Sequence, residues 1–357
     1  MTRMRYGAVM ERIDGILPQV PGSGDHGAGP GERPGGGPGT SAEAEPSRRL
    51  GLGWWWLMGL GAAVAGLLPW VITGMRLPLQ NLWAVQVPPD EMPIALLPFS
   101  QYAISLIVAI LVMGYATAGI VARAMRDRRP RGAVVALGLG VVAVHLIATV
   151  QTTIVVTEGV VRKAASQLYV LGLAGGIVAT ILLGVLVLWL VARAPVPGAV
   201  MALSLSAVVA GSWFSGLILP LGSVPTEASS LLVTSVLRWL PAVLVGVAIA
   251  WGGVGTVGRV VGAACGLLIL WIVPAVFTAL GASLGSRVLL PYPAELLDYG
   301  LGVLRLALLQ PEVVLPPVVV AVITAAAGLL VRRMFIGQRA AASALAPRTN
   351  ADGQEPQ

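Results

Sequence analysis

The chain has 357 residues, of which 56% are hydrophobic and only 11% are charged, and its formal net charge is +7. A soluble domain has about 25% charged residues, so a soluble fold of this length could not hide so much apolar surface. A bilayer solvates apolar side chains directly, and the composition therefore predicts an integral membrane protein. The arginines stand at the ends of apolar segments and do not line one polar face, which indicates membrane topology and excludes nucleic acid as a partner.

The first 50 residues contain little that could form a core. Residues 21–46 are rich in Gly and Pro and cannot bury enough apolar surface to offset the entropy of ordering. We therefore expect residues 1–50 to be a mostly disordered tail. The first long apolar run begins only after Arg48 and Arg49, so we expect it to be an uncleaved membrane anchor and not a signal peptide.

Eight apolar stretches follow, each near the length of about 20 residues that a helix needs to cross a bilayer. The sequence thus predicts an all-α, polytopic transmembrane helix bundle of about eight spans over residues 51–336, followed by a disordered tail at residues 337–357. Arg238 lies near the start of the sixth stretch. The expected spans are 54–74, 99–122, 133–156, 169–192, 198–219, 236–254, 260–281 and 316–333.

Basic residues concentrate in the two tails, in the segment 123–131, and at Arg193 and Arg259. Because cytoplasmic loops carry an excess of basic residues, this distribution predicts a multi-pass protein of the cell membrane with both termini in the cytoplasm. An even number of spans is needed to keep both tails on one side. Lys163 is the only lysine among 23 basic residues, a composition typical of a GC-rich bacterial genome.

A weak internal repeat accompanies the basic residues. The second, fourth, sixth and eighth stretches each run into an arginine, at Arg123, Arg193, Arg259 and Arg332. The regular spacing suggests four tandem helical hairpins that arose by duplication, as in many transporter folds. Selection for positive charge on the inside explains the same arginines without duplication, so both explanations stay open.

Small residues recur at four-residue spacing within several spans. Lipid tails are as apolar as Leu, so helices in a membrane associate through close packing of small side chains. We expect these stripes to be helix contacts and not ligand sites. The longest stripes are Gly172, Gly176, Thr180 and Gly184 in the fourth span and Gly258, Gly262 and Gly266 at the seventh.

Ionisable residues deep in a membrane are costly, and the third span contains one, His145. Thr149 and Thr152 share its helix face, and Glu158 follows at the outer end. One interpretation is a hydrophilic track or proton-sensing site. The other is a neutral histidine that forms a hydrogen bond with a neighbouring helix.

The outer loops are the second place where chemistry is predicted. Asp90 and Glu91 follow two prolines in the first outer loop, where acids could serve an enzyme acting on a lipid-linked substrate. Residues Ala294–Gln310 have the pattern of an amphipathic helix, with acids and Arg305 on one stripe. This helix is expected either to lie along the outer membrane surface or to cover a cavity from outside.

Motifs of known chemistry are missing from the sequence. It contains no GxxxxGK[ST], HExxH or GxSxG motif, and its single cysteine, Cys265, cannot form an internal disulfide, so no catalytic residue, cofactor or metal is predicted. No family is recognised. Three hypotheses remain: a permease-like protein moving or binding an apolar or lipid-like molecule, a scaffold or regulatory subunit of an envelope complex, and an enzyme acting on a lipid-linked substrate. The expected partners are the lipid bilayer and either another membrane protein or a second copy of the chain.

Overall fold

The structure is a computed structural model that describes residues 51–345, apart from Leu79, Asn81, Pro89, Arg287, Leu290 and Pro291. The side chains of residues 335–345 are outside the description. The tail expected at residues 1–50 and the chain from residue 346 onward also lie outside the described residues.

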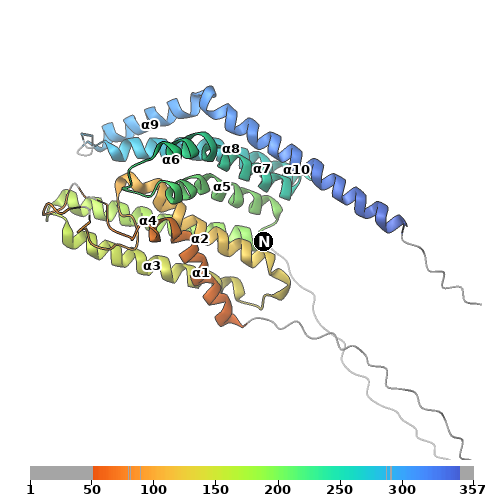
Figure 1. The fold of residues 1–357 in the computed structure, drawn as a ribbon, viewed down its shortest axis with the longest axis horizontal. Helices are drawn as coiled ribbons and strands as arrows, with labels where there is room; N and C mark the ends of the chain where they lie inside the picture. Colours follow the sequence, from red (N-terminus) through yellow and green to blue (C-terminus); the bar gives the residue numbers. More distant parts are fainter. Residues whose placement is uncertain are drawn as a thin grey trace, which may run out of the picture. The chain divides into compact units, whose positions relative to one another are not determined.

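Within this part of the chain eight helical segments are long and apolar enough to cross a membrane, and no strand is formed. This confirms the predicted all-α bundle of a multi-pass membrane protein (Figure 1). The spans are α1 (Leu52–Val71), η1 with α2 (Gln101–Ala103 and Ile104–Ala124), α3 (Ala133–Gly159), α4 (Ala164–Arg193), α5 (Val196–Ile218), the segment α6–α7 (Glu227–Gly252), α8 (Val257–Gly285) and the first part of α10 (Pro311–Leu345).

The sixth span begins earlier than the sequence pattern predicts. It consists of α6 (Glu227–Leu231), a π-helical turn η3 (Leu232–Val236), a 3₁₀ turn η4 (Leu237–Trp239) and α7 (Leu240–Gly252). Pro241 has no N–H to donate, so the regular ladder of hydrogen bonds cannot pass through it, and the turns before it are irregular. Arg238 therefore lies inside a span and not at its start.

The predicted amphipathic helix forms as α9 (Pro293–Leu309), and it packs along α8 (Figure 1). The Trp271 indole N–H, near the middle of α8, donates a hydrogen bond to the Leu308 carbonyl at 3.2 Å. The C-terminal end of α9 thus reaches half-way along a spanning helix. The chain turns at Gln310 and continues as α10 through Leu345, into the stretch expected as a tail.

The helices form two halves with the same order of contacts. In the first half α1 packs on α2 and α3, and α2 packs on α4; in the second, α5 packs on α7 and α8, and α7 packs on α10. Each half has its own buried hydrophobic core. The contact between α2 and α5 joins the halves, with a third core of α2, α4 and α5 residues between them. This pattern is what a repeated four-helix unit would produce.

Glycines allow the closest helix approaches, and the following ones lie outside the predicted small-residue stripes. A Cβ atom at Gly59 of α1 would lie 3.1 Å from the Gly140 Cα of α3 and would overlap the Leu137 carbonyl oxygen. In the second half, a Cβ at Gly246 of α7 would lie 2.6 Å from the Ala321 carbonyl oxygen of α10. The backbone atoms of the neighbouring helix cannot move aside as a flexible side chain can. Only glycine at these positions therefore allows the helix pairs to pack this closely.

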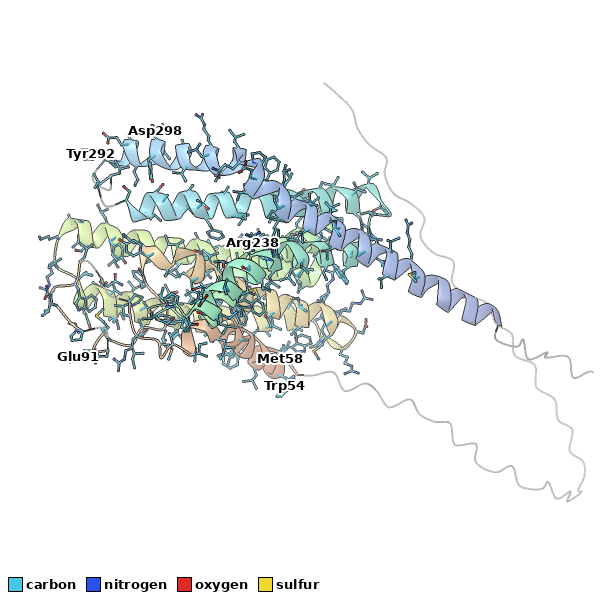
Figure 2. All side chains as sticks on the ribbon, turned by 45° about the horizontal axis from the view of Figure 1, so that its top comes forward. Trp54, Met58, Glu91, Arg238, Tyr292 and Asp298 are labelled. Atoms are coloured by element: carbon cyan, nitrogen blue, oxygen red, sulfur yellow. The ribbon has the colours of Figure 1, made fainter. Side chains whose placement is uncertain are left out.

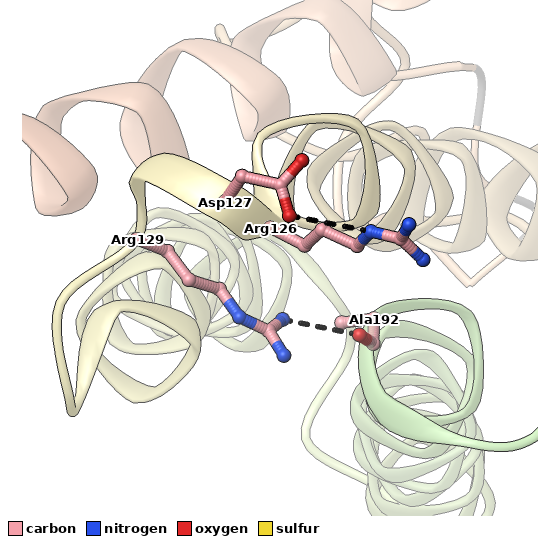
Figure 3. Close-up of polar contacts among 4 residues, drawn as sticks. All are labelled: Arg126, Asp127, Arg129 and Ala192. Carbon is pink, nitrogen blue, oxygen red and sulfur yellow. Dashed lines mark hydrogen bonds and ion pairs between the residues drawn. The ribbon is translucent and has the colours of Figure 1, made fainter. Parts of the chain in front are cut away.

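Arginines tie the helix ends together at one end of the bundle, which we call the arginine end. The Arg123 guanidinium donates to the carbonyls of Val191, at 2.7 Å, and Ala194, at 3.2 Å, at the end of α4. Arg129 donates to the Ala192 carbonyl at 3.1 Å (Figure 3). The last carbonyls of a helix have no partner within it and carry partial negative charge, so a cation satisfies both needs.

The second half repeats this arrangement. Arg332 of α10 donates to the carbonyl of Trp251, at 3.1 Å, in the last turn of α7. Arg123 from the first half lies over the Trp251 ring, with its Cζ 5.0 Å from the ring centroid. A cation–π contact thus joins the two halves at the arginine end.

We predict that Gly59→Ala lowers the free energy of unfolding by about 2 kcal/mol, because the added methyl group forces α1 and α3 apart. Gly61→Ala on the same helix is the matched control, since a Cβ there meets nothing within 4 Å. It should leave stability unchanged or raise it by up to about 1 kcal/mol through helix propensity. Denaturation of the purified protein in detergent measures both; equal effects would contradict the close α1–α3 contact.

Candidate functional site

The polar stripe predicted on α3 is buried. His145 and Thr152 are fully buried, and Thr149 is 6% exposed. The His145 ring packs edge-on against Tyr115 of α2, with 5.1 Å between ring centroids. Within the described part of the chain neither ring nitrogen of His145 has a hydrogen-bond partner, and nor does the Tyr115 hydroxyl. His145 therefore contacts the neighbouring helix through an aromatic contact and not through a hydrogen bond.

The end of this stripe that lies away from the arginine end holds the loop between α1 and α2. The Thr152 hydroxyl oxygen accepts a hydrogen bond from the Leu97 N–H at 3.0 Å, and the Gln151 amide oxygen accepts one from the Leu96 N–H at 2.9 Å. The Gln151 amide N–H donates to the Ile94 carbonyl at 2.9 Å. These side chains supply hydrogen bonds that the loop backbone would otherwise lack.

The acidic candidates lie at the end of the bundle opposite the arginine end, which we call the loop end because the loop between α1 and α2 lies there. Asp90, Glu91 and Glu158 are exposed, and none forms an ion pair with another described residue (Figure 2 labels Glu91). The structure has a cavity between α5 and α8 and a second one between α2, α5 and α7, and neither is lined by these acids or by the α3 stripe. Among the residues that the structure places, no group of His, Cys, Asp and Glu could hold a metal ion. The sequence-based site hypotheses therefore stay predictions.

A cavity lies mainly among the helices of the second half, at the end of the bundle opposite the arginine end, and we call it the loop-end cavity. Its volume is about 930 Å³, and its walls come from the start of α2, from α5, from the α6–α7 segment, from α8 and from the α9–α10 turn. The volume falls in the range of about 300–1,000 Å³ that is typical of ligand sites. Most of the wall is aliphatic or aromatic.

Three interrupted helical segments contribute to the lining of this cavity. Pro274 interrupts the hydrogen bonds of α8, and the Thr278 hydroxyl donates to the Pro274 carbonyl at 3.0 Å. The π-helical turn of the sixth span contributes Thr234, and the break between α9 and α10 contributes Gln310. Irregular backbone at membrane depth is tolerated only where it is covered by protein or lines a cavity, and here it does so.

Arg238 is the only charged residue among the described residues that line the loop-end cavity. Its guanidinium lies over the Trp239 ring, with Cζ 4.4 Å from the ring centroid. Figure 2 shows Arg238 inward of the end at which Glu91, Tyr292 and Asp298 lie. A cation inside a span is costly, and the aromatic face offsets only part of that cost. This residue is therefore the strongest functional candidate in the cavity.

Sequence reasoning missed Arg238 as a site because it placed the residue at the edge of the sixth span. The signal that sequence reasoning missed was the start of a helix at Thr226. The Thr226 hydroxyl accepts a hydrogen bond from the Ser229 N–H at 3.2 Å, and the Ser229 hydroxyl accepts one from the Thr226 N–H at 3.0 Å. This reciprocal capping begins the helix before Arg238. The polar residues of the first turns lowered the apparent hydrophobicity there.

Comparisons with known protein families, with curated proteins and with solved structures found no match. The chemistry of the cavity itself must therefore indicate its ligand. An apolar wall of this extent with one guanidinium suits a molecule with a hydrocarbon part and an anionic group.

We predict that Thr152→Val lowers the free energy of unfolding by about 1.5 kcal/mol, because the buried Leu97 N–H loses its acceptor. Thr153→Val on the next position is the control. The Thr153 hydroxyl donates only within α3, to the Thr149 carbonyl at 2.7 Å, so its loss leaves no N–H unpaired. Thermal unfolding in detergent compares the two; similar small losses would show that Thr152 does not hold the loop.

Proposed function

We propose that this protein is permease-like and binds and moves a lipid-like molecule in the cell membrane, with both termini in the cytoplasm. The observation that supports this most is the loop-end cavity, an open, largely apolar space of about 930 Å³ among membrane-spanning helices. Substrate sites of many transporters lie between interrupted helices at membrane depth, and three interruptions border this cavity.

Arg238 indicates the class of molecule. An anionic headgroup would pair with its guanidinium, and the hydrocarbon part would contact Leu270, Phe277 and Val314 of the cavity wall. The Arg238 side chain is exposed, so its guanidinium is accessible to such a headgroup. Ser212, Ser215 and the other hydroxyls of the wall would bind the polar atoms that remain.

The interruptions also supply a means of movement. The α6–α7 segment and the α9–α10 turn both line the cavity, and each contains a short stretch outside regular α-helix. A few such residues can absorb the dihedral changes of a hinge. Motion of α9 and α10 against α5 and α8 would open the cavity to either leaflet.

The test is lipid movement in proteoliposomes that contain phospholipids labelled with nitrobenzoxadiazole, with dithionite used to bleach the outer leaflet. Wild-type protein should expose labelled phosphatidylglycerol from the inner leaflet faster than empty liposomes do. Ser212→Trp, which fills the cavity, should abolish the gain. Arg238→Gln should slow the movement of phosphatidylglycerol between leaflets about tenfold, because one charge-assisted contact is lost. The rate of phosphatidylcholine movement should stay unchanged.

Two matched variants keep this test specific. Ser235→Trp places the same ring at an exposed position outside the cavity, and Arg305→Gln removes an exposed arginine of α9 that does not line it. Both should behave as wild type. Rates no faster than in empty liposomes, or full activity of Ser212→Trp, would contradict the proposal.

A second candidate function, a scaffold for another membrane protein, is favoured by one face of α4. A Cβ added at Gly172, Gly175 or Gly176 would meet nothing within 4 Å, whereas Gly184 of the same helix packs on Tyr115. The outer part of the predicted stripe is thus unoccupied and could receive a partner helix. Purification of a stable complex at fixed stoichiometry, lost in Gly176→Leu, would favour this function over the permease.

A further inference from the structure

A second cavity lies at the arginine end, between α2, α5 and α7, and we call it the arginine-end groove. Its volume is about 720 Å³. One wall belongs to the first half of the bundle and the other to the second half. The groove therefore lies beside the contacts of α2 and α4 with α5, which join the two halves.

The length of the groove fits one leaflet of a bilayer. Its lining on α2 extends from Met113 to Arg123, a rise of about 15 Å at 1.5 Å per residue. The hydrocarbon core of a bilayer is about 30 Å thick, so each leaflet contributes about 15 Å. A chain lying in the groove would thus run from the headgroup level to the middle of the membrane.

The groove is open towards the surrounding lipid. Three of its apolar lining residues are about half exposed: Ile120 at 50%, Val247 at 52% and Trp251 at 46%. The other apolar walls include Phe214 and the small residues Ala116 and Ala248, and the two alanines leave space between the helices. A lipid chain could enter from the side without any helix moving.

Positive charge lies at one end of the groove. Arg123 and Arg126 are both lining residues, and Arg129 follows the short 3₁₀ turn that begins at Arg126 (Figure 3). The one acid beside them, Asp127, is 3.6 Å from the Arg126 guanidinium, and their side chains are 88% and 72% exposed. An ion pair this exposed is weak, so Arg126 remains available to an anion.

We propose that the arginine-end groove binds an anionic phospholipid of the leaflet at the arginine end. One acyl chain lies between α2 and α7, and the phosphate contacts Arg126 and the outer edge of the Arg123 guanidinium, which Trp251 holds at this level. The lipid bridges the two halves and stabilises their contact. This site is separate from the loop-end cavity and does not depend on the proposed transport.

The experiment is native mass spectrometry of the full-length protein in detergent, titrated with phosphatidylglycerol or with phosphatidylcholine of identical acyl chains. Phosphatidylglycerol should bind at least fivefold more tightly than phosphatidylcholine. Arg126→Gln should lower phosphatidylglycerol affinity about fivefold, since one basic residue near an anionic headgroup contributes about 1 kcal/mol. Ala248→Phe should weaken the binding of both lipids, because the added ring fills the groove.

Controls separate the groove from general charge and general apolar surface. Arg193→Gln removes an exposed arginine at the same end that does not line the groove, and Ala179→Phe adds a ring to an exposed face of α4. Both should bind as wild type does, and glycerol phosphate without acyl chains should not bind. Equal affinity for the two lipids, an Arg193→Gln effect as large as that of Arg126→Gln, or binding of glycerol phosphate alone would overturn the proposal.

Discussion

Hydrocarbon offers no hydrogen bonds, so every backbone polar group inside the membrane must find its partner within the protein. This constraint explains why the described chain is helical and why its few departures from helix matter. Where α4 and α7 end, arginines supply donors to carbonyls that lack them. Where the sixth span and the α9–α10 segment break, residues of both breaks line a cavity.

The two halves have the same order of helix contacts, but their helices pack with different closeness. In the first half glycines bring α1 and α3 into backbone contact, and aromatic residues such as Trp55 and Tyr115 fill the remaining space. In the second half Pro241 and Pro274 interrupt two helices, and α9 lies along α8. The first half is therefore a closed core, while the second contains the space in which a ligand would bind.

Hydropathy predicts the number of spans well because the bilayer imposes one length and one polarity on all of them. It placed the start of the sixth span, Glu227–Gly252, too late, because hydrogen bonds made by Thr226 and Ser229 begin the helix among polar residues. Periodicity predicted α9 as a helix, but its place along α8 depends on the Trp271–Leu308 hydrogen bond, a tertiary contact. The same holds for His145, Thr149 and Thr152: their shared face could be predicted, whereas their burial could not. Arg238 became a candidate only when the span around it was known.

The central claim, that the second half contains a lipid-binding cavity centred on Arg238, is tested most directly by photocrosslinking. A fatty acid that carries a diazirine is irradiated with the reconstituted protein, and the modified residues are mapped by mass spectrometry. Modification should concentrate on cavity-lining positions of α5 and α8, such as Ser215 and Phe277, and should fall in Arg238→Gln. Equal modification of the outward face of α3, where Leu139 is 58% exposed, would contradict the account.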